Sequence, residues 1–461
     1  MQCSPKSVMQ PSKHFQLSDS IFPELYLLFH IKIKNMKLFS PLLPVLLLAT
    51  ACIAQKPRAQ SSDISPASKG AYAEGILAGA DRINVYLPLI QGRTVGIFAN
   101  QTSMVGNTHL VDTLRKLGIN IKVIFGPEHG FRGTADAGEK VGNYIDDKTG
   151  IPVVSLYGSK RRPSAEDVKD VDMLIFDIQD VGVRFYTFIS SLEEFMEGAF
   201  ELGKPLMILD RPNPNGHYVD GPVLDLKFRS FVGRQPVPVV YGMTIAEYAF
   251  MIAGEKWLSE KANAKYAYYR TAQNSPDTPF HFQVIKCKGY DHKTKYVLPV
   301  KPSPNLPNIQ SIYLYPSTCL FEGTVLSEGR GTNKQFQVFG HPLLPKNLYS
   351  FTPNPNEGAK SSKLYGQLCY GWDLSGTPDE VLAKVDNHFQ LKWLMEAYKL
   401  FPQKDSFFLK SNSFNRLAGN DVLMQQIKDG KTEDEIRKSW EPKLSEFKAI
   451  RKKYLLYDDF E

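Results

Sequence analysis

The chain has 461 residues, of which 43% are hydrophobic and 12% aromatic, values typical of a globular protein with room for two domains. Its formal net charge is +7; five lysines and two acidic residues before Cys52 account for +3, which leaves +4 for the remainder. No block rich in Lys and Arg occurs, so the composition does not support nucleic-acid binding.

The N-terminal region contains a candidate export signal. Met36-Lys37 precedes LFSPLLPVLLLATA, an apolar run too short to span a bilayer, and Ala49-Thr50-Ala51 comes directly before Cys52. We prefer a bacterial lipobox with Cys52 as the lipidated residue over simple cleavage or a retained anchor. Residues 1–70 are therefore predicted to be a leader and linker. The protein is expected to be exported, to the periplasm or, through Cys52, to the outer membrane.

The next region alternates between short apolar runs and amphipathic stretches. The runs predict strands at 94–100, 119–125, 151–157, 171–177 and 204–210, and the stretches predict helices at 109–117 and 185–202. Strands separated by helices favour an α/β fold with a parallel sheet. No GxGxxG motif follows the first strand, so a dinucleotide cofactor is not expected.

The pattern changes after a Pro-rich connector at 299–307. Thr377 with Pro378 predicts the start of a helix over 379–400, and 432–454 predicts a second long helix. We place the boundary near 297, which gives an N-terminal domain at 71–297 and a smaller α+β domain at 298–461. The remaining cysteines, Cys287, Cys319 and Cys369, are scattered, so we expect buried thiols rather than disulfides or metal ligands.

Polar side chains follow each predicted strand, where ligands bind in an open α/β sheet. The candidates are Asn100, Glu128, His129, Asp177, Gln179, Asp180, Arg184, Asp210, Arg211 and Asn213, with Tyr157 after the third strand. Purely structural roles stay open for several of them: Asp177 and Asp180 as helix caps, Arg211 as a partner of Asp177 or Asp210, Asn213 in a turn, and His129 as a structural residue. Glu128 is the strongest candidate, because it lies between Pro127 and His129 in a glycine-rich loop.

A second polar cluster lies at 322–332, EGTVLSEGRGT, with Glu322, Glu328 and Arg330 among three glycines. It predicts a ligand loop; the alternative is a structural loop with surface charges. The spacing and lysine of a P-loop are missing. A carboxylate from each domain, facing a shared cleft, suits cleavage of a glycosidic bond, and an arginine can bind an anionic substituent.

These segments resemble the exo-β-N-acetylmuramidase family (NamZ-like glycoside hydrolases, formerly a domain of unknown function). The matching motifs are GPEHGFRG (126–133), DIQDVGVRFYT (177–187), LDRPNPNG (209–216), DGPVLD (220–225), SPNLPN (303–308) and EGTVLSEGRGT (322–332), together with the C-terminal segment 428–457. The resemblance covers roughly residues 80–460.

The resemblance implies a Rossmann-like domain, a smaller C-terminal domain and an active-site cleft between them. It implies hydrolysis of terminal, non-reducing N-acetylmuramic acid from peptidoglycan fragments in cell-wall turnover. Separately, we expect no metal and no cofactor. Glu128 would be the leading catalytic carboxylate, with Glu322 or Glu328 as the second. Asn305, in SPNLPN, joins the substrate-binding candidates. Arg132, Arg184, Arg211 and Arg330 are candidates for the lactyl carboxylate of the substrate.

Two rival functions stay open. One is a metal-dependent hydrolase using His129, Asp177 and Asp180, although the nine histidines are scattered and form no HExxH motif. The other is a lipoprotein that binds muropeptides without cleaving them.

Overall fold

The computed structural model describes residues 75–133, 139, 141–272 and 281–461. The predicted leader and its Cys52 lie outside the described residues. The described residues all belong to one unit that spans 67–461.

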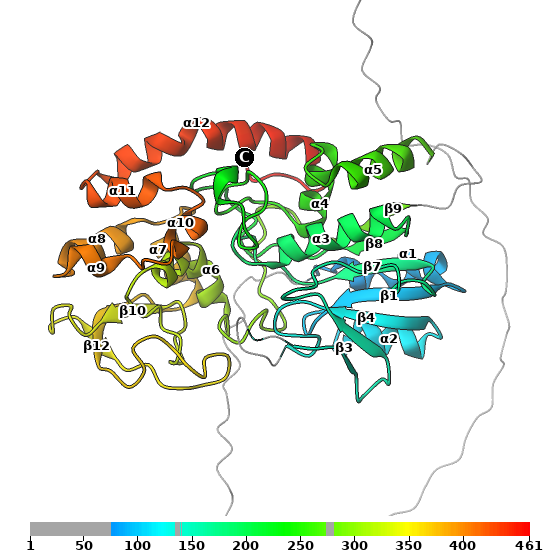
Figure 1. Ribbon diagram of the computed structural model, residues 1–461, viewed down its shortest axis with the longest axis horizontal. Coiled ribbons are helices and arrows are strands. Elements are labelled where there is room, and N and C mark those ends of the chain that lie inside the picture. The colour runs from blue at the N-terminus through cyan, green and yellow to red at the C-terminus, as the bar shows by residue number, and fades with distance from the viewer. Residues whose placement is uncertain (1–74, 134–138, 140, 273–280) are drawn as a thin grey trace, which may run out of the picture. The chain divides into compact units, whose positions relative to one another are not determined.

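A seven-stranded sheet forms the centre of the N-terminal part (Figure 1), in the order β5-β6-β4-β1-β7-β8-β9. Every neighbouring pair is parallel except β5 and β6. The strands are β1 (Thr94–Ala99), β4 (Asn120–Gly126), β5 (Tyr144–Ile145), β6 (Pro152–Ser155), β7 (Met173–Asp177), β8 (Leu206–Leu209) and β9 (Phe282–Ile285). The five predicted strands are present, and the predicted α/β fold with a parallel sheet is confirmed. β5 and β9 were not predicted, because they are short and lack a clear apolar run.

The strand order reverses at β1. The chain runs from β1 outward to β4 and β6, and then crosses to β7, β8 and β9 on the other side. A crevice for ligands forms at such a reversal, at the carboxyl ends of the strands. Here that position is where β4, β1 and β7 end, beside a small hairpin of β2 (Met104–Val105) and β3 (Thr108–His109).

Successive side chains of each strand face opposite layers of helices. On β7, Met173 and Ile175 pack in the same core as α1 (Ile83–Ile90) and α2 (Leu110–Lys116). Leu174 and Phe176 pack instead with α3 (Phe188–Glu201), α4 (Ile245–Gly254) and α5 (Glu260–Ala272). The alternation explains why these runs are apolar throughout, since both faces of the sheet are covered.

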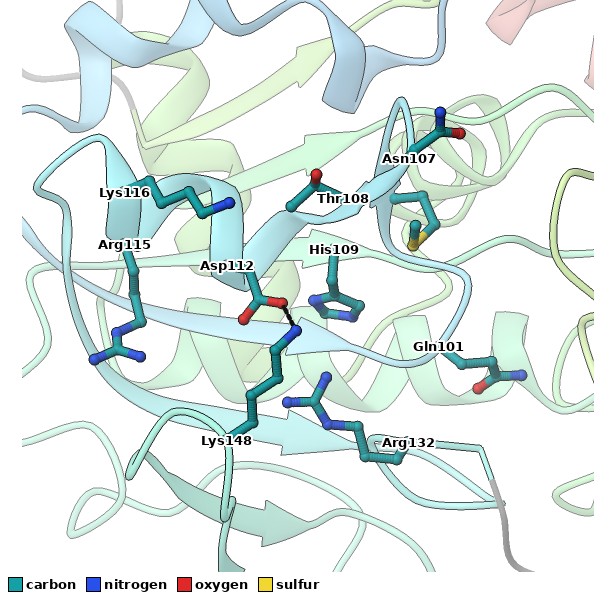
Figure 2. Close-up of a pocket in the computed structure, with 10 residues that line it drawn as sticks. Gln101, Asn107, Thr108, His109, Asp112, Arg115, Lys116, Arg132 and Lys148 are labelled. Atoms are coloured by element: carbon teal, nitrogen blue, oxygen red, sulfur yellow. Dashed lines mark hydrogen bonds and ion pairs between the residues drawn. The ribbon is translucent and has the colours of Figure 1, made fainter. Parts of the chain in front are cut away.

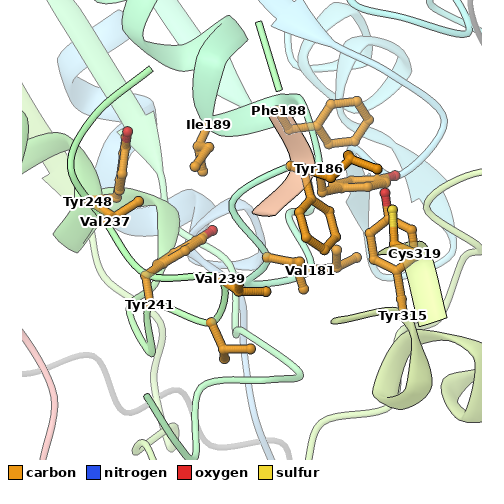
Figure 3. Packing of buried hydrophobic residues seen from close by; sticks show 14 of the residues in the cluster. Val181, Tyr186, Phe188, Ile189, Val237, Val239, Tyr241, Tyr248, Tyr315 and Cys319 are labelled. Carbon is orange, nitrogen blue, oxygen red and sulfur yellow. The ribbon is translucent and has the colours of Figure 1, made fainter. Parts of the chain in front are cut away.

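The core on the α3 side contains residues from segments that lie far apart in the sequence (Figure 3). Val181 and Tyr186 follow β7, Val239 comes from a later loop, and Tyr315 comes from α6 (Ile309–Thr318), yet all four pack together. This shared core joins the sheet to the C-terminal part. Cys287, Cys319 and Cys369 are free and buried, as predicted.

The C-terminal part is smaller and of mixed α+β type, as predicted. It contains the antiparallel sheet β10-β12-β11, made of β10 (Val338–His341), β12 (Cys369–Asp373) and β11 (Tyr349–Phe351). The helices that follow are α7 (Pro378–Val385), α8 (Lys392–Leu400), α9 (Lys404–Phe407), α10 (Ser413–Ala418), α11 (Val422–Lys428) and α12 (Glu433–Arg451). The boundary near 297 stays a prediction. Among the described residues, no helix combines the length and the apolar character needed to cross a membrane.

One predicted helix was wrong: the stretch 379–400 forms two helices, α7 and α8. Thr377 caps α7 as expected, accepting a hydrogen bond from the Glu380 N–H. The helix then ends because Asp386 and Asn387 adopt left-handed backbone conformations, with φ of 50° and 53°. The second long helix agrees with its prediction, since Thr432 caps α12 in the same way.

Candidate active site

The turn after β4 places Glu128 at the carboxyl edge of the sheet. Pro127 ends the strand, and its carbonyl accepts a hydrogen bond from the Gly130 N–H at 3.0 Å. His129 and Gly130 both have left-handed backbone conformations, with φ of 69° and 75°. Such a conformation costs a glycine little and suits a tight turn, which presents Glu128 on the outside of the bend.

Both carboxylate oxygens of Glu128 accept hydrogen bonds from hydroxyl groups. The Tyr157 hydroxyl donates to Oε1 at 3.0 Å, and the Thr187 hydroxyl donates to Oε2 at 2.9 Å. Tyr157 follows β6, and Thr187 immediately precedes α3. The loops after β6 and β7 therefore orient a carboxylate that follows β4.

Glu128 faces a cavity of about 300 Å³. Its polar lining consists of Glu128, His129, Thr187, Ser303, Asn305, Glu322 and Arg330. Its aromatic and aliphatic lining consists of Phe185, Tyr186, Phe188, Val232, Leu306, Tyr315 and Phe336. An apolar wall with a few polar groups is typical of a site for a small organic ligand.

The glycine-rich loop at 322–332 brings a second carboxylate and a cation to this cavity. Gly329 and Gly331, with φ of 81° and 79°, flank Arg330 and bend the chain so that the guanidinium turns inward. Arg330 Nη1 lies 2.9 Å from Glu322 Oε1 and 3.4 Å from Glu328 Oε1. The guanidinium thus bridges the two glutamates.

The two glutamates of this loop differ in their surroundings. Glu322 lines the cavity, and its side chain is 28% exposed. The Glu328 side chain is 3% exposed and forms an ion pair with Lys363 at 2.8 Å. Burial opposes ionisation of Glu328, but the charges of Lys363 and Arg330 outweigh burial and hold the pKa of the carboxyl below its usual range. Glu328 is therefore a buried anion that supports Arg330, while Glu322 is open to a ligand.

Five of the predicted site residues meet at this cavity, namely Glu128, His129, Asn305, Glu322 and Arg330. The Asn305 side chain is held by a hydrogen bond from Nδ2 to the Gly358 carbonyl at 2.7 Å.

Other predicted residues are built into the support beneath the site. Asp177 and Arg211 form a buried two-point ion pair, with Arg211 Nε 2.6 Å from Oδ1 and Nη2 2.9 Å from Oδ2. This agrees with the structural interpretation of Arg211. Asp180 accepts hydrogen bonds from the Tyr241 hydroxyl and the Gly182 N–H. Burial raises the pKa of Asp180 to about 6. Neither aspartate caps α3.

Asp210 and Arg184 connect the sheet to more distant segments. Asp210 accepts hydrogen bonds from the Tyr457 hydroxyl at 2.6 Å and from the Ala246 N–H at 3.0 Å. Burial raises the pKa of Asp210 to about 7. Arg184 is fully buried and donates to backbone carbonyls, including that of Leu417 at 2.7 Å.

The amide side chains among the candidates form local turns and braces. The Asn100 side chain accepts a hydrogen bond from the Thr102 N–H at 2.9 Å, and the Asn213 side chain accepts one from the Asn215 N–H at 2.8 Å. The second bond forms the turn that was the structural interpretation of Asn213. Gln179 donates to the Pro212 carbonyl at 2.7 Å. None of these three amides is among the residues that line the cavity.

Arg132 lies in a different hollow, a groove along α2 (Figure 2). Its Nε and Nη2 atoms donate to Asp146 at 2.9 and 2.7 Å. Within the described residues, no group of three or more His, Cys, Asp and Glu side chains is placed to hold a metal ion. The set named for a metal site, His129, Asp177 and Asp180, is divided between the cavity and the buried support.

Comparison with known proteins identifies the family. A model of the N-terminal domain of the exo-β-N-acetylmuramidase NamZ matches residues 95–310, and a model of its C-terminal domain matches 313–457. The chain belongs to the NamZ family. It is 37% identical over 417 residues to the peptidoglycan β-N-acetylmuramidase NamZ of Bacillus subtilis strain 168, covering 86% of this chain and 95% of that protein.

Two solved structures from Bacteroides fragilis NCTC 9343 resemble this member of the NamZ family. Both are described as DUF1343 family proteins. One is 44% identical with a TM-score of 0.73, covering 84% of this chain and 100% of the other. The second is 26% identical with a TM-score of 0.66, covering 83% and 99%.

Three contributors to the site in this NamZ-family chain were not predicted from the sequence. Thr187 binds Glu128, Lys363 neutralises Glu328, and Phe336 lines the cavity beneath Arg330. Thr187 ends the motif DIQDVGVRFYT, so its position beside other candidates was a usable signal. Lys363 lies in an ordinary polar stretch, SSKLYG, which carries no such signal.

Proposed function

We propose that this chain hydrolyses the terminal, non-reducing β-linked N-acetylmuramic acid of peptidoglycan fragments, with Glu128 and Glu322 as the catalytic carboxylates. The observation that carries the proposal is that these two glutamates, almost 200 positions apart in the chain, line one small cavity. The B. subtilis relative is named for the same activity. A cavity of about 300 Å³ suits one terminal sugar unit rather than the middle of a long strand.

Glu128 is assigned the role of general acid at the glycosidic oxygen. Its carboxyl group is held in place by Tyr157 and Thr187, so it can meet the leaving oxygen without first losing side-chain freedom. Glu322 is the preferred second carboxylate, because it lines the cavity whereas Glu328 is buried against Lys363.

The second step can follow one of three routes. Glu322 acts as a nucleophile in a retaining reaction, or activates water in an inverting one. In the third route the substrate's acetamido oxygen attacks the anomeric carbon, and Glu322 polarises the acetamido group. The first and third routes release the β-anomer and the second releases the α-anomer.

Arg330 is the cation placed to recognise the lactyl carboxylate of the substrate. It is the arginine among the described lining residues of the cavity, and Glu322 and Glu328 raise its pKa despite burial. A guanidinium can contact a carboxylate at two points. Tyr186, Tyr315 and Phe336 offer faces for the sugar ring and its methyl groups.

A chromogenic β-N-acetylmuraminide tests the proposal directly. We expect release of the chromophore by the wild type, and a large loss with Glu128→Gln and Glu322→Gln. Glu328→Gln is the matched change in the same loop as Glu322, and we expect it to impair folding before it impairs chemistry. Proton NMR of the sugar first released distinguishes the α- from the β-anomer. An inactive wild type, or an unaffected Glu128→Gln variant, would contradict the assignment.

We also propose that the chain is an exported lipoprotein, modified at Cys52 and located at the periplasmic side of a bacterial outer membrane. The support is the apolar run after Lys37 and the small residues before Cys52. Incorporation of labelled palmitate by the wild type, and its loss in Cys52→Ala, are the expected results. Equal labelling of both proteins would contradict the proposed site.

A further inference from the structure

A second hollow, of about 780 Å³, runs along α2 and shares no lining residue with the Glu128 cavity. Its walls carry four cations: Arg115 and Lys116 from the last turn of α2, Arg132 from the loop after β4, and Lys148 from the turn after β5 (Figure 2). We call this hollow the α2 groove. Its cations come from three separate segments of the chain.

The α2 groove has more positive than negative charge. Asp112, in the wall, pairs with Lys148, and the buried Asp146 pairs with Arg132, so two of the four cations have a carboxylate partner and two positive charges remain. His109, also in the wall, does not alter this excess, because burial lowers its pKa to about 4 and leaves the ring neutral.

Arg115 and Lys116 are exposed, and neither forms an ion pair with another of the described residues. Cations in the last turn of a helix stabilise its carboxyl end, which is a sufficient structural role for these two residues. Arg132 and Lys148 extend into the same hollow from other segments, and each forms an ion pair there with a carboxylate.

The α2 groove begins next to the cavity. The Pro302 carbonyl accepts a hydrogen bond from Gln101 Nε2 at 3.0 Å and from the Tyr186 hydroxyl at 2.9 Å. Gln101 lines the groove, and Tyr186 lines the cavity. Arg132 also follows Glu128 by four residues, within the same loop. A ligand that extends out of the cavity on this side therefore meets the Gln101 and Arg132 end of the groove first, and it reaches Arg115 and Lys116, in the last turn of α2, by extending along the helix.

We propose that the α2 groove binds the leaving-group side of the glycan and recognises the lactyl carboxylates that it carries. The inference rests on the proposed function, because an enzyme that holds the terminal sugar in a small cavity must accommodate the rest of the chain outside it. In an alternating glycan, every second sugar of that remainder carries a carboxylate when its peptide has been removed. Exposed cations attract such a chain over about 10 Å at moderate salt.

The test compares a disaccharide with a tetrasaccharide, both peptide-free and both ending in non-reducing N-acetylmuramic acid. Only the tetrasaccharide has a carboxylate beyond the scissile bond. We expect the wild type to show a higher kcat/KM for the tetrasaccharide, and the preference to weaken as salt is raised. Arg115→Gln/Lys116→Gln should reduce the preference roughly three- to tenfold, in line with the loss of two exposed charge contacts.

The matched control is Lys261→Gln/Lys265→Gln, which removes the same amount of positive charge. Both lysines lie on α5, a helix on the opposite face of the sheet from α2. This variant should keep the wild-type preference. A tetrasaccharide with an amidated second lactyl group should behave like the disaccharide. Since the chromogenic monosaccharide never reaches the α2 groove, Arg115→Gln/Lys116→Gln should cleave it at the wild-type rate.

The outcomes separate the two proposals. If the wild type cleaves the chromogenic substrate but treats both glycans alike, the groove proposal is overturned and the proposed function stands. An unchanged preference in Arg115→Gln/Lys116→Gln, or an equal loss in the α5 control, also overturns it. If the wild type cleaves none of these substrates, the proposed function fails and the groove proposal fails with it.

Discussion

Glu128 and Asp177 are carboxylates at the ends of β4 and β7, the two strands that flank β1, yet their surroundings differ completely. Glu128 is half-buried, lines a cavity and accepts hydrogen bonds from two hydroxyl groups. Asp177 is fully buried, and Arg211 occupies both of its oxygens. A position at the strand end brings a residue near the crevice, but its partners decide whether it can meet a substrate.

The same distinction separates Glu322 from Glu328. They lie six positions apart in one loop, and Arg330 contacts both. Lys363 neutralises only Glu328, which leaves Glu322 as the carboxylate that faces the cavity. In both pairs, a cation neutralises the buried member, Arg211 for Asp177 and Lys363 for Glu328, and the open member faces the cavity.

The largest expected effect is the loss of activity in Glu128→Gln. General acid catalysis contributes about 10²–10⁴-fold, so kcat should fall by roughly 10³-fold or more. Glutamine keeps the size of the side chain, so the melting temperature should stay close to that of the wild type. Turnover of a chromogenic β-N-acetylmuraminide and calorimetry check the two halves of this prediction. A variant that is inactive because it is unfolded would not support a catalytic role.

The opposite result is expected for the Asp177–Arg211 pair. Asp177→Asn leaves the Arg211 guanidinium buried without its counter-charge, which costs about 3–5 kcal/mol of unfolding free energy. Activity per folded molecule should remain within a few-fold of the wild type at low temperature. Denaturant unfolding measures the first quantity, and turnover corrected for the folded fraction measures the second. A stable but inactive Asp177→Asn would place Asp177 in the chemistry instead.

Local patterns were sufficient to predict much of the fold. Apolar runs identified the five main strands, and Thr377 and Thr432 marked two helix starts, because each signal lies within a few residues of its effect. The convergence of Glu128 with the segment after β7 also follows from a parallel sheet. The break between α7 and α8 was missed, because the helical pattern continues through Asp386 and Asn387.

The sequence did not predict which carboxylates of the candidate site are open and which are buried. This division depends on contacts between distant positions, such as Arg211 with Asp177 and Lys363 with Glu328. Arg184 illustrates the same limit: it was a candidate for binding the substrate, but its guanidinium is enclosed by backbone carbonyls, including that of Leu417. An arginine used for packing and one used for binding look alike in a sequence.

A smaller effect, on the pH dependence of stability, should distinguish the buried Asp210. Burial raises its pKa from 3.8 to about 7, so between these values the folded protein binds a proton that the unfolded chain has lost. Its contribution to unfolding free energy is therefore full below pH 4 and declines as the pH rises to 7. Asp210→Asn has no proton to lose there. The unfolding free energy of the Asp210→Asn variant, relative to that of the wild type, should rise by about 2 kcal/mol from pH 5 to pH 7 and then level off. Parallel denaturant titrations measure this difference, and a constant difference would contradict the assignment.

The smallest expected effect concerns the hydroxyl groups that hold Glu128. Thr187→Val removes the hydrogen bond to Oε2 with little change in shape, and one hydrogen bond contributes about 0.5–1.5 kcal/mol. If the bond orients the carboxylate for reaction, kcat should fall up to about tenfold while KM changes little, because the loss is felt in the transition state. Thr187→Ser keeps the hydroxyl and should recover most of the rate. A wild-type rate in Thr187→Val together with a loss in Thr187→Ser would mean that Thr187 acts through its methyl group, which would make the cavity wall, rather than the hydrogen bond, the feature that distinguishes Glu128 from the buried Asp177.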